Sequence, residues 1–199
     1  MPALLGLFLF SVLLRTGTSL ECEVCSGFGS SCTGSMETCY AGQDTCVITL
    51  SENSLAGEKL QMVTKACGYS YECKMPAIYQ NFGSGKYTRS FVTCCAGDAC
   101  KTATPQFPPA MTTSNGKQCP GSYCLSPFGC ETETVDCVGE ENYCLDIEEK
   151  ITYGKFVMHI TMKGCVTKEV CAVKEGETSI AGGQADVIKA GCKPASVAN

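Results

Sequence analysis

The spacing of the cysteines constrains this chain more than any other feature. Six cysteines from Cys32 to Cys94 are separated by steps of 7, 7, 21, 6 and 21 residues, and six from Cys130 to Cys192 repeat the same five steps. Elsewhere the two halves share little obvious sequence, so the repeated feature is an arrangement of cross-links. We therefore expect two copies of one disulfide-stabilised fold.

The number of cysteines indicates an extracellular protein. The chain has 18 cysteines in 199 residues, and all of them follow Glu21. Disulfides persist in oxidising compartments, and this density is typical of small secreted scaffolds. Because the number is even, we expect every cysteine to be paired and no free thiol to remain.

The chain is acidic, with 15 basic and 20 acidic residues and a net charge of −5, or −6 if a leader containing Arg15 is removed. This balance disfavours nucleic acid and anionic membranes as partners. It suits a cationic partner, but mild acidity also simply aids solubility, and both interpretations stay open.

The amino terminus has the pattern of a secretory signal. An apolar block from Ala3 to Leu14 precedes Arg15 and a short run of small residues that ends at Ser19. The block is too short to span a bilayer as a helix, so we expect a signal peptide over residues 1–19 with cleavage after Ser19. No hydrophobic tail follows Cys192, so we expect a secreted protein that is free in extracellular fluid, without a membrane anchor.

Between the cysteines the pattern favours strands. Short β-branched, alternating segments flank turn-rich stretches, which predicts hairpins. We expect three of them: Thr45–Leu50 with Leu60–Thr64, Ala77–Tyr79 with Tyr87–Thr93, and Tyr143–Ile147 with Phe156–Met162. In the last hairpin, Met158, Ile160 and Met162 should share one face, with His159 and Thr161 on the other.

The fold class is therefore a small, disulfide-rich, all-β protein. We expect one domain over residues 20–103, a linker over 104–118 and a second domain over 119–199. The first is too small to be stabilised comfortably by hydrophobic burial alone. Its disulfides, at about 2 to 4 kcal/mol each, would supply much of the stability.

The segment between the two cysteine-rich units is unusual. It has no cysteine, it contains Pro105, Pro108 and Pro109, and it ends in the turn signal Asn115-Gly116. Such a segment should be semi-extended. It is either a plain spacer or a preorganised apolar strip for contact with a partner. The residues of this strip are Pro105, Gln106, Phe107, Pro108, Pro109, Ala110 and Met111.

The sequence argues against an enzyme. The only histidine, His159, has no obvious acid or nucleophile beside it, as a catalytic triad would require. The Cys22–Cys25 gap resembles half of a zinc site but lacks a second pair at suitable spacing. Gly83-Ser84-Gly85-Lys86 is followed by Tyr87 where a phosphate loop has Ser or Thr. We expect no catalytic residue, no metal and no cofactor.

The cysteine frame resembles a known family of folds. The opening Leu20-Glu21-Cys22-Glu23-Val24-Cys25 and the closing Cys94-Cys95, with Cys100, are similar to a three-finger domain of the urokinase-receptor type. Two such units with a proline-rich linker that leads into Asn115–Gly121 resemble the gamma-type phospholipase A2 inhibitors of reptile blood plasma. The resemblance implies two tandem three-finger domains. It also implies a secreted, non-catalytic plasma protein that binds and blocks a secreted phospholipase A2.

The resemblance also implies a disulfide pairing, which spacing alone leaves open. In the first unit the implied pairs are Cys22–Cys46, Cys25–Cys32, Cys39–Cys67, Cys73–Cys94 and Cys95–Cys100. In the second unit they are Cys119–Cys144, Cys124–Cys130, Cys137–Cys165 and Cys171–Cys192. The second unit thus lacks the last disulfide of the first, and Lys101 stands where many three-finger domains have Asn.

Two surfaces are candidates for partner contact. The resemblance implies the proline-rich segment from Pro105 to Asn115, which favours the contact strip over the spacer. The alternative function, a ligand or decoy for a cell-surface receptor, would use exposed finger tips near Asn53–Gly57, Phe82–Lys86 and Tyr153–Lys155. The chain has no N-glycosylation signal, as in the unglycosylated subunit of an inhibitor with two subunit types. A homo- or hetero-oligomer with a related subunit is therefore also implied.

The mature protein should begin at Leu20 and contain no free thiol. We expect the intact mass of the secreted protein to match residues 20–199 with every cysteine oxidised. Alkylation of the denatured, unreduced protein should not change this mass. Retention of the leader, or labelling of any cysteine, would contradict this expectation.

Overall fold

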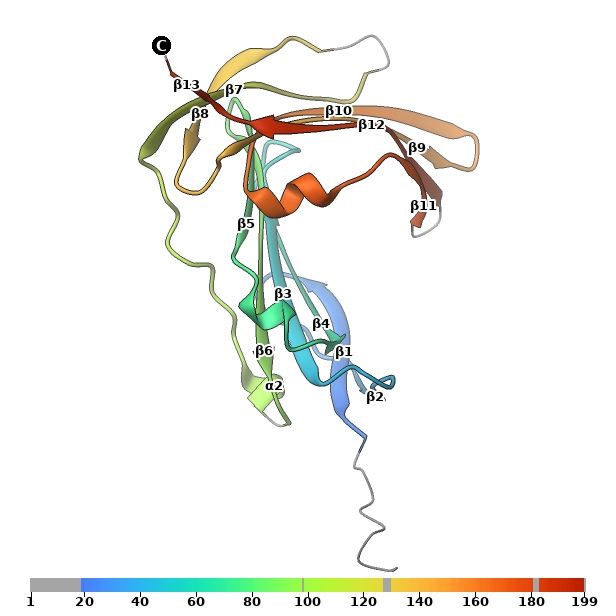
Figure 1. Ribbon diagram of the computed structural model, residues 1–199. Helices are drawn as coiled ribbons and strands as arrows, with labels where there is room; N and C mark the ends of the chain where they lie inside the picture. Colours follow the sequence, from blue (N-terminus) through green and yellow to red (C-terminus); the bar gives the residue numbers. More distant parts are fainter. Residues whose placement is uncertain (1–18, 98, 127–129, 181–182, 199) are drawn as a thin grey trace, which may run out of the picture.

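The computed structural model describes residues 19–97, 99–126, 130–180 and 183–198 (Figure 1). The expected signal peptide, residues 1–19, lies outside the described residues except for Ser19. Nearly all regular structure is antiparallel β, and the described residues contain nine disulfides. The predicted fold class, a small disulfide-rich all-β protein, is confirmed. No helix among the described residues is both long and apolar enough to cross a membrane.

The first unit is a sheet in the order β5-β6-β3-β4-β1-β2, with two short helical turns. Its elements are β1 (Glu21–Phe28), β2 (Ser35–Thr38), β3 (Thr45–Asn53), β4 (Leu60–Gly68), η1 (Glu72–Lys74), β5 (Ile78–Gly83), β6 (Lys86–Cys95) and α2 (Ala99–Thr102).

The second unit has a sheet in the order β11-β12-β9-β10, and β7 pairs with β10, β8 and β13. Its elements are β7 (Ser114–Cys124), β8 (Glu133–Val138), β9 (Tyr143–Tyr153), β10 (Phe156–Val166), η2 (Lys168–Ala172), β11 (Gly176–Ile180), β12 (Gly183–Pro194) and β13 (Ser196–Val197). All three predicted hairpins are present, as β3–β4, β5–β6 and β9–β10. Since β7 begins at Ser114, inside the expected linker, the boundaries of the domains stay a prediction.

The first 21-residue step between cysteines, from Cys46 to Cys67 and from Cys144 to Cys165, corresponds to the same hairpin in both units. Cys46 lies opposite Cys67 across β3–β4, and Cys144 lies opposite Cys165 across β9–β10. Each of these four cysteines bonds to a cysteine elsewhere in its unit, so the base of each hairpin is cross-linked on both strands. The nine disulfides of the structure are the nine pairs that the resemblance implies.

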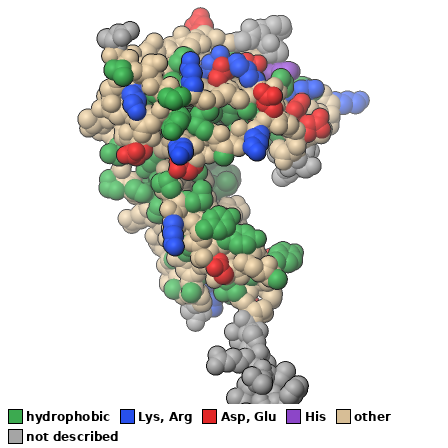
Figure 2. Space-filling view, viewed as in Figure 1, with side chains coloured by type: hydrophobic (Ala, Val, Ile, Leu, Met, Phe, Trp, Pro, Cys, Tyr) green, Lys and Arg blue, Asp and Glu red, His purple; other side chains and the backbone are tan. Residues whose placement is uncertain are grey.

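The sheet of the second unit has one apolar and one charged face. The β9–β10 register places Met158, Ile160 and Met162 on one face, as predicted. On the other face, Asp146 forms ion pairs with Lys163 and Lys189 at 3.6 and 2.8 Å. Figure 2 shows charged side chains gathered mainly over this unit, at the top of the view.

The two units are joined by direct strand pairing. The end of β5 continues into the second unit's sheet, where Asn81 lies opposite Cys165 and Gln80 opposite Val166 on β10 (Figure 1). Gly164 permits this approach, because a Cβ there would lie only 2.0 Å from the Asn81 carbonyl oxygen. The backbone N–H of Thr167 also donates to the Tyr79 carbonyl at 3.1 Å. The sheet is therefore continuous across the junction.

A side chain of the first unit completes the core of the second. Phe82, at the tip of the β5–β6 hairpin, is 1% exposed and packs with Leu145, Ile147, Val166 and Val170. Burial of a phenylalanine side chain contributes about 1.5 to 3 kcal/mol, which favours this docking.

The docking corrects one expectation. The tip Phe82–Lys86, which we expected to be exposed, has Phe82 and Gly83 buried and only Ser84 and Gly85 exposed. The tip Asn53–Gly57 also lies at the junction, since Leu55 packs against the cluster that contains Leu145 and Val166. Beside it, Ser54 is buried and donates to the Gly85 carbonyl at 2.6 Å. A turn-rich sequence marks a hairpin tip but does not show what covers it. Of the three expected tips, Tyr153–Lys155 is exposed at every residue.

Replacement of Phe82 should weaken the second unit, although this residue belongs to the first. We expect Phe82→Ala to lower the free energy of unfolding by about 3 to 5 kcal/mol because it leaves a cavity in a closed core. Denaturant unfolding with the disulfides intact measures this. Phe156→Ala, at an 82% exposed position, is the control and should change stability by less than about 0.5 kcal/mol. Equal effects of both variants would show that Phe82 is not docked.

Candidate functional site

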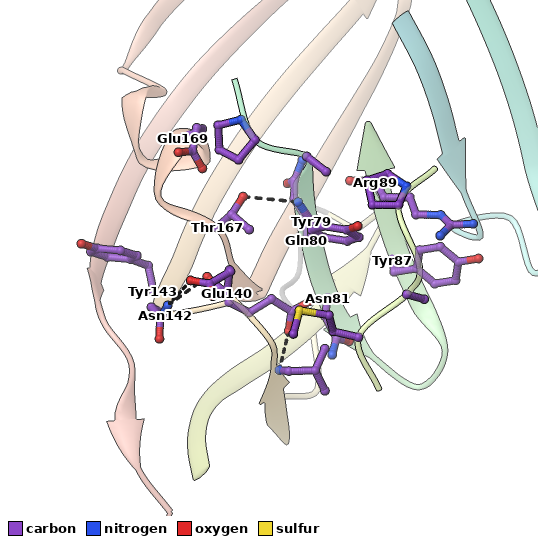
Figure 3. A pocket seen from close by; sticks show the side chains of 18 of the residues that line it. Tyr79, Gln80, Asn81, Tyr87, Arg89, Glu140, Asn142, Tyr143, Thr167 and Glu169 are labelled. Atoms are coloured by element: carbon purple, nitrogen blue, oxygen red, sulfur yellow. Dashed lines mark hydrogen bonds between the residues drawn. The ribbon is translucent and has the colours of Figure 1, made fainter. Parts of the chain in front are cut away.

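A cavity of about 1170 Å³ lies at the junction of the two units. Three parts of the chain form its walls: the β5–β6 hairpin, the segment Pro108–Met111, and the second-unit segments Val138–Tyr143 and Thr167–Glu169 (Figure 3). The cavity therefore exists only because the linker crosses beside the point where the units pair.

The β5–β6 wall is built by a tight turn. Ser84 and Gly85 both have positive φ, at 48° and 74°, as a two-residue hairpin loop requires. The register pairs Tyr79 with Arg89 and Asn81 with Tyr87, so these four side chains share the face toward the linker. The backbone N–H of Tyr79 also donates to the hydroxyl of Thr167 at 3.3 Å, which ties this wall to the second unit (Figure 3).

The linker wall is anchored on both units. Pro105 is buried, and Phe107 packs against the cluster of Ile48, Leu50 and Val63 in the first unit. Met111 lies against Gly139 of the second unit, where an added Cβ would be 2.6 Å from the Met111 sulfur. The span from Pro108 to Ala110 is therefore held at both ends.

Arg89 fixes the linker electrostatically. Its guanidinium lies 4.1 Å from the centre of the Phe107 ring and binds the Glu52 carboxylate at 3.0 Å. Burial alone would raise the pKa of Glu52, but hydrogen bonds from Tyr87 and Arg89 outweigh it and lower that pKa. Burial and the neighbouring Glu52 raise the pKa of Tyr87. The Glu52 carboxyl group therefore stays ionised, and the Tyr87 hydroxyl stays neutral, around neutral pH.

The second-unit wall contains a buried carboxyl group. Glu141 is 4% exposed, and its Oε2 accepts from the Val138 N–H at 3.0 Å. Burial raises the pKa of Glu141 to about 7, although hydrogen bonds from Val138 and from Asn81 of the first unit oppose the shift. The Asn115 side-chain amide donates to the carbonyls of Gly139 and Glu141 at 3.0 and 3.2 Å, which holds this loop beside the linker.

The structure separates the seven residues of the predicted contact strip into two groups. Pro105 is buried and Phe107 half-buried, so both serve as anchors. Gln106, Pro109, Ala110 and Met111 are exposed, and the last three also line the cavity with Pro108.

Sequence reasoning did not single out the other walls of the cavity. Tyr79, Arg89, Glu141 and Thr167 carry no motif, and they come together only through the junction. The proline-stiffened strip was the one signal in the sequence that pointed to this place.

The chemistry of the site suits binding. Its described lining combines proline, aliphatic and tyrosine side chains with seven charged side chains and several neutral hydrogen-bonding groups, and it contains no histidine, cysteine or serine. His159 does not line it and lies opposite Lys150 on β9. Among the described residues, the two groups of three close sulfurs that could suit a metal belong to cysteines already in disulfides.

Comparison with known proteins identifies relatives along most of the chain. A family model described as phospholipase A2 inhibitor matches residues 20–102. The chain is 38% identical to "Phospholipase A2 inhibitor NAI" of Notechis ater, over 88% of each chain. It is 34% identical to a phospholipase A2 inhibitor gamma subunit of Gloydius brevicaudus siniticus, over 90% of this chain and 92% of that one. The solved structure of mouse TEX101 is similar at 18% identity and a TM-score of 0.37, covering 88% of this chain and 99% of that chain.

Glu141 should make the stability of the protein depend on pH. Because its pKa is raised from 4.5 to about 7, the native state keeps a proton there that the unfolded chain has lost. Stability should therefore fall by about 3 kcal/mol as the pH rises through this window. Denaturant unfolding at several pH values measures this. Glu141→Gln should remove this pH-dependent loss of stability, whereas Glu140→Gln, at the exposed neighbouring position, should leave it unchanged. An unchanged profile for Glu141→Gln would contradict the assignment.

Proposed function

Because the chain belongs to the phospholipase A2 inhibitor family, we propose that it binds a secreted phospholipase A2 and blocks it without catalysing a reaction itself. The observation that carries this proposal is the similarity to named inhibitors, at 34 to 38% identity over nearly all of the mature chain. The binding chemistry of the junction is consistent with it. Such a protein would be secreted into an extracellular fluid such as plasma.

The contact surface that we propose is the exposed part of the linker. Gln106, Pro109 and Ala110 are exposed along a segment that Pro105 and Phe107 hold at one end. Met111, which is also exposed, holds the other end against Gly139. A strip that is already ordered loses little conformational entropy when it binds, and this raises affinity. The net charge of −5 favours the approach of a cationic enzyme.

Inhibition would work by occupation of surface. An enzyme held against the linker and the adjoining walls of the junction would be kept from its lipid substrate. Several relatives are named as subunits, such as "Phospholipase A2 inhibitor 25 kDa subunit" of Naja kaouthia, 33% identical over 77% of this chain and 83% of that one. We extend the proposal to an assembly of this chain with a second copy or with a related subunit.

One observation favours the alternative, a ligand or decoy for a cell-surface receptor. At the tip of the β9–β10 hairpin, Tyr153, Phe156 and Val157 are 43%, 82% and 52% exposed. Exposed aromatic side chains at a projecting tip are typical anchors of protein contacts.

Two double variants separate the functions. Gln106→Arg with Ala110→Arg places bulky cations on the exposed linker without touching its anchors. We expect it to raise the concentration for half-inhibition of vesicle hydrolysis by at least about tenfold, a loss of about 1.4 kcal/mol. Tyr153→Ala with Phe156→Ala should leave inhibition unchanged.

The assay should include a panel of secreted phospholipases A2, and gel filtration should detect the complex. The reverse pattern, with loss only in the tip variant, would assign the contact to the finger tip. Absence of inhibition and of a complex across the panel, also after addition of plasma fractions that could supply a companion subunit, would overturn the proposed function.

A further inference from the structure

We propose that the junction cavity is a binding site for a single long acyl chain with an anionic head group, the chemistry of a free fatty acid. The cavity would bind such a molecule whether or not the protein inhibits a phospholipase. The argument rests on its size, its walls, its rigidity and its charge.

The cavity is large enough for an extended chain. Its volume of about 1170 Å³ slightly exceeds the range of pockets for small ligands, which are typically about 300–1,000 Å³. Pro108, Ala110 and Met111 of the linker line the cavity together with Tyr79 and Tyr87 of the β5–β6 hairpin, whose rings are labelled in Figure 3. These apolar and aromatic side chains offer van der Waals contact to a hydrocarbon chain.

The cavity is held open by its own construction. Phe107 fixes the linker to the first unit, Met111 fixes it to the second, and the pairing of β5 with β10 sets the separation of the units. Between the anchors, Pro108 and Pro109 restrict the backbone. The linker therefore cannot fold down onto the tyrosines, and apolar surface stays accessible until a ligand covers it.

Lysines at the cavity offer a partner for an anionic head group. Four basic side chains line it, Lys59, Arg89, Lys117 and Lys168, against three acidic ones, Glu140, Glu141 and Glu169. Arg89 is neutralised by Glu52, and Lys117 donates to the neutral Asn142 at 2.7 Å.

Two of the lysines remain available. Lys59 lies 6.0 Å from the centre of the Tyr87 ring, and Lys168 is exposed at the start of η2. Neither forms an ion pair among the described residues. Burial raises the pKa of Glu141 to about 7, which reduces the negative charge of the lining near neutral pH. A carboxylate at the mouth, paired with a flexible lysine, would complete the site.

Titration with a fluorescent polyene fatty acid, displaced by oleate, tests the site without any phospholipase present. We expect saturable one-to-one binding that strengthens by at least about tenfold from octanoate to palmitate, as burial of an added chain requires. Methyl oleate and lysophosphatidylcholine, which share the chain but lack the free carboxylate, should bind at least about fivefold more weakly than oleate.

Matched variants locate the site. Ala110→Trp, which fills the cavity from the linker, should weaken oleate binding by at least about tenfold, and Ala56→Trp, at an exposed position outside the lining, should not. Lys168→Glu should weaken oleate but not methyl oleate, and Lys174→Glu, exposed and outside the lining, should change neither.

Three results would overturn the proposal. They are absence of saturable binding to the native protein, equal binding by the Ala110→Trp and Ala56→Trp variants, and equal affinity for oleate and its methyl ester. Because the readout needs no enzyme, its failure is distinguishable from failure of the inhibition assay.

Discussion

Disulfide cross-linking is the constraint on which the rest of this structure depends. Among the residues that the structure describes, the buried hydrophobic side chains form four small clusters, and cysteines make up most of two of them. Clusters of this size could not hold long hairpins in place by burial alone. With Cys46 and Cys144 cross-linked at the hairpin bases, the strands can extend well beyond each cysteine core. Their outer ends are then free to make other contacts.

The contacts between the two units are made by such an outer strand end. The β5–β6 hairpin of the first unit reaches into the second, where Phe82 is buried and β5 pairs with β10. A continuous sheet and a shared core resist relative movement of the units much more than a flexible linker would. The two repeats therefore share one continuous sheet, and the linker crosses beside their junction. The cavity is a consequence of this geometry rather than of any single element.

The sequence presents spacer and site as alternative roles for the linker, and the proposed function gives it both. Phe107, under the Arg89 guanidinium, and Met111, against Gly139, hold it in place. The exposed residues between them face both solvent and the cavity. An enzyme bound to the outer surface and an acyl chain bound beneath would share these residues. The two proposed ligands are thus expected to influence each other through the linker.

The sequence by itself determined the disulfide-rich β class, the repeated cysteine frame and the three hairpins, and it drew attention to the proline-rich segment. These follow from local properties: cysteine spacing, alternation of apolar residues, and proline content. Only the tertiary structure decided that Phe82 is buried, that Glu141 lies in a closed wall, and that the contact strip divides into anchors and exposed residues. Each of these depends on which surface of one unit covers a residue of the other. Contacts between segments so distant in sequence leave no periodic signal in either segment, and for this reason the cavity could not be predicted.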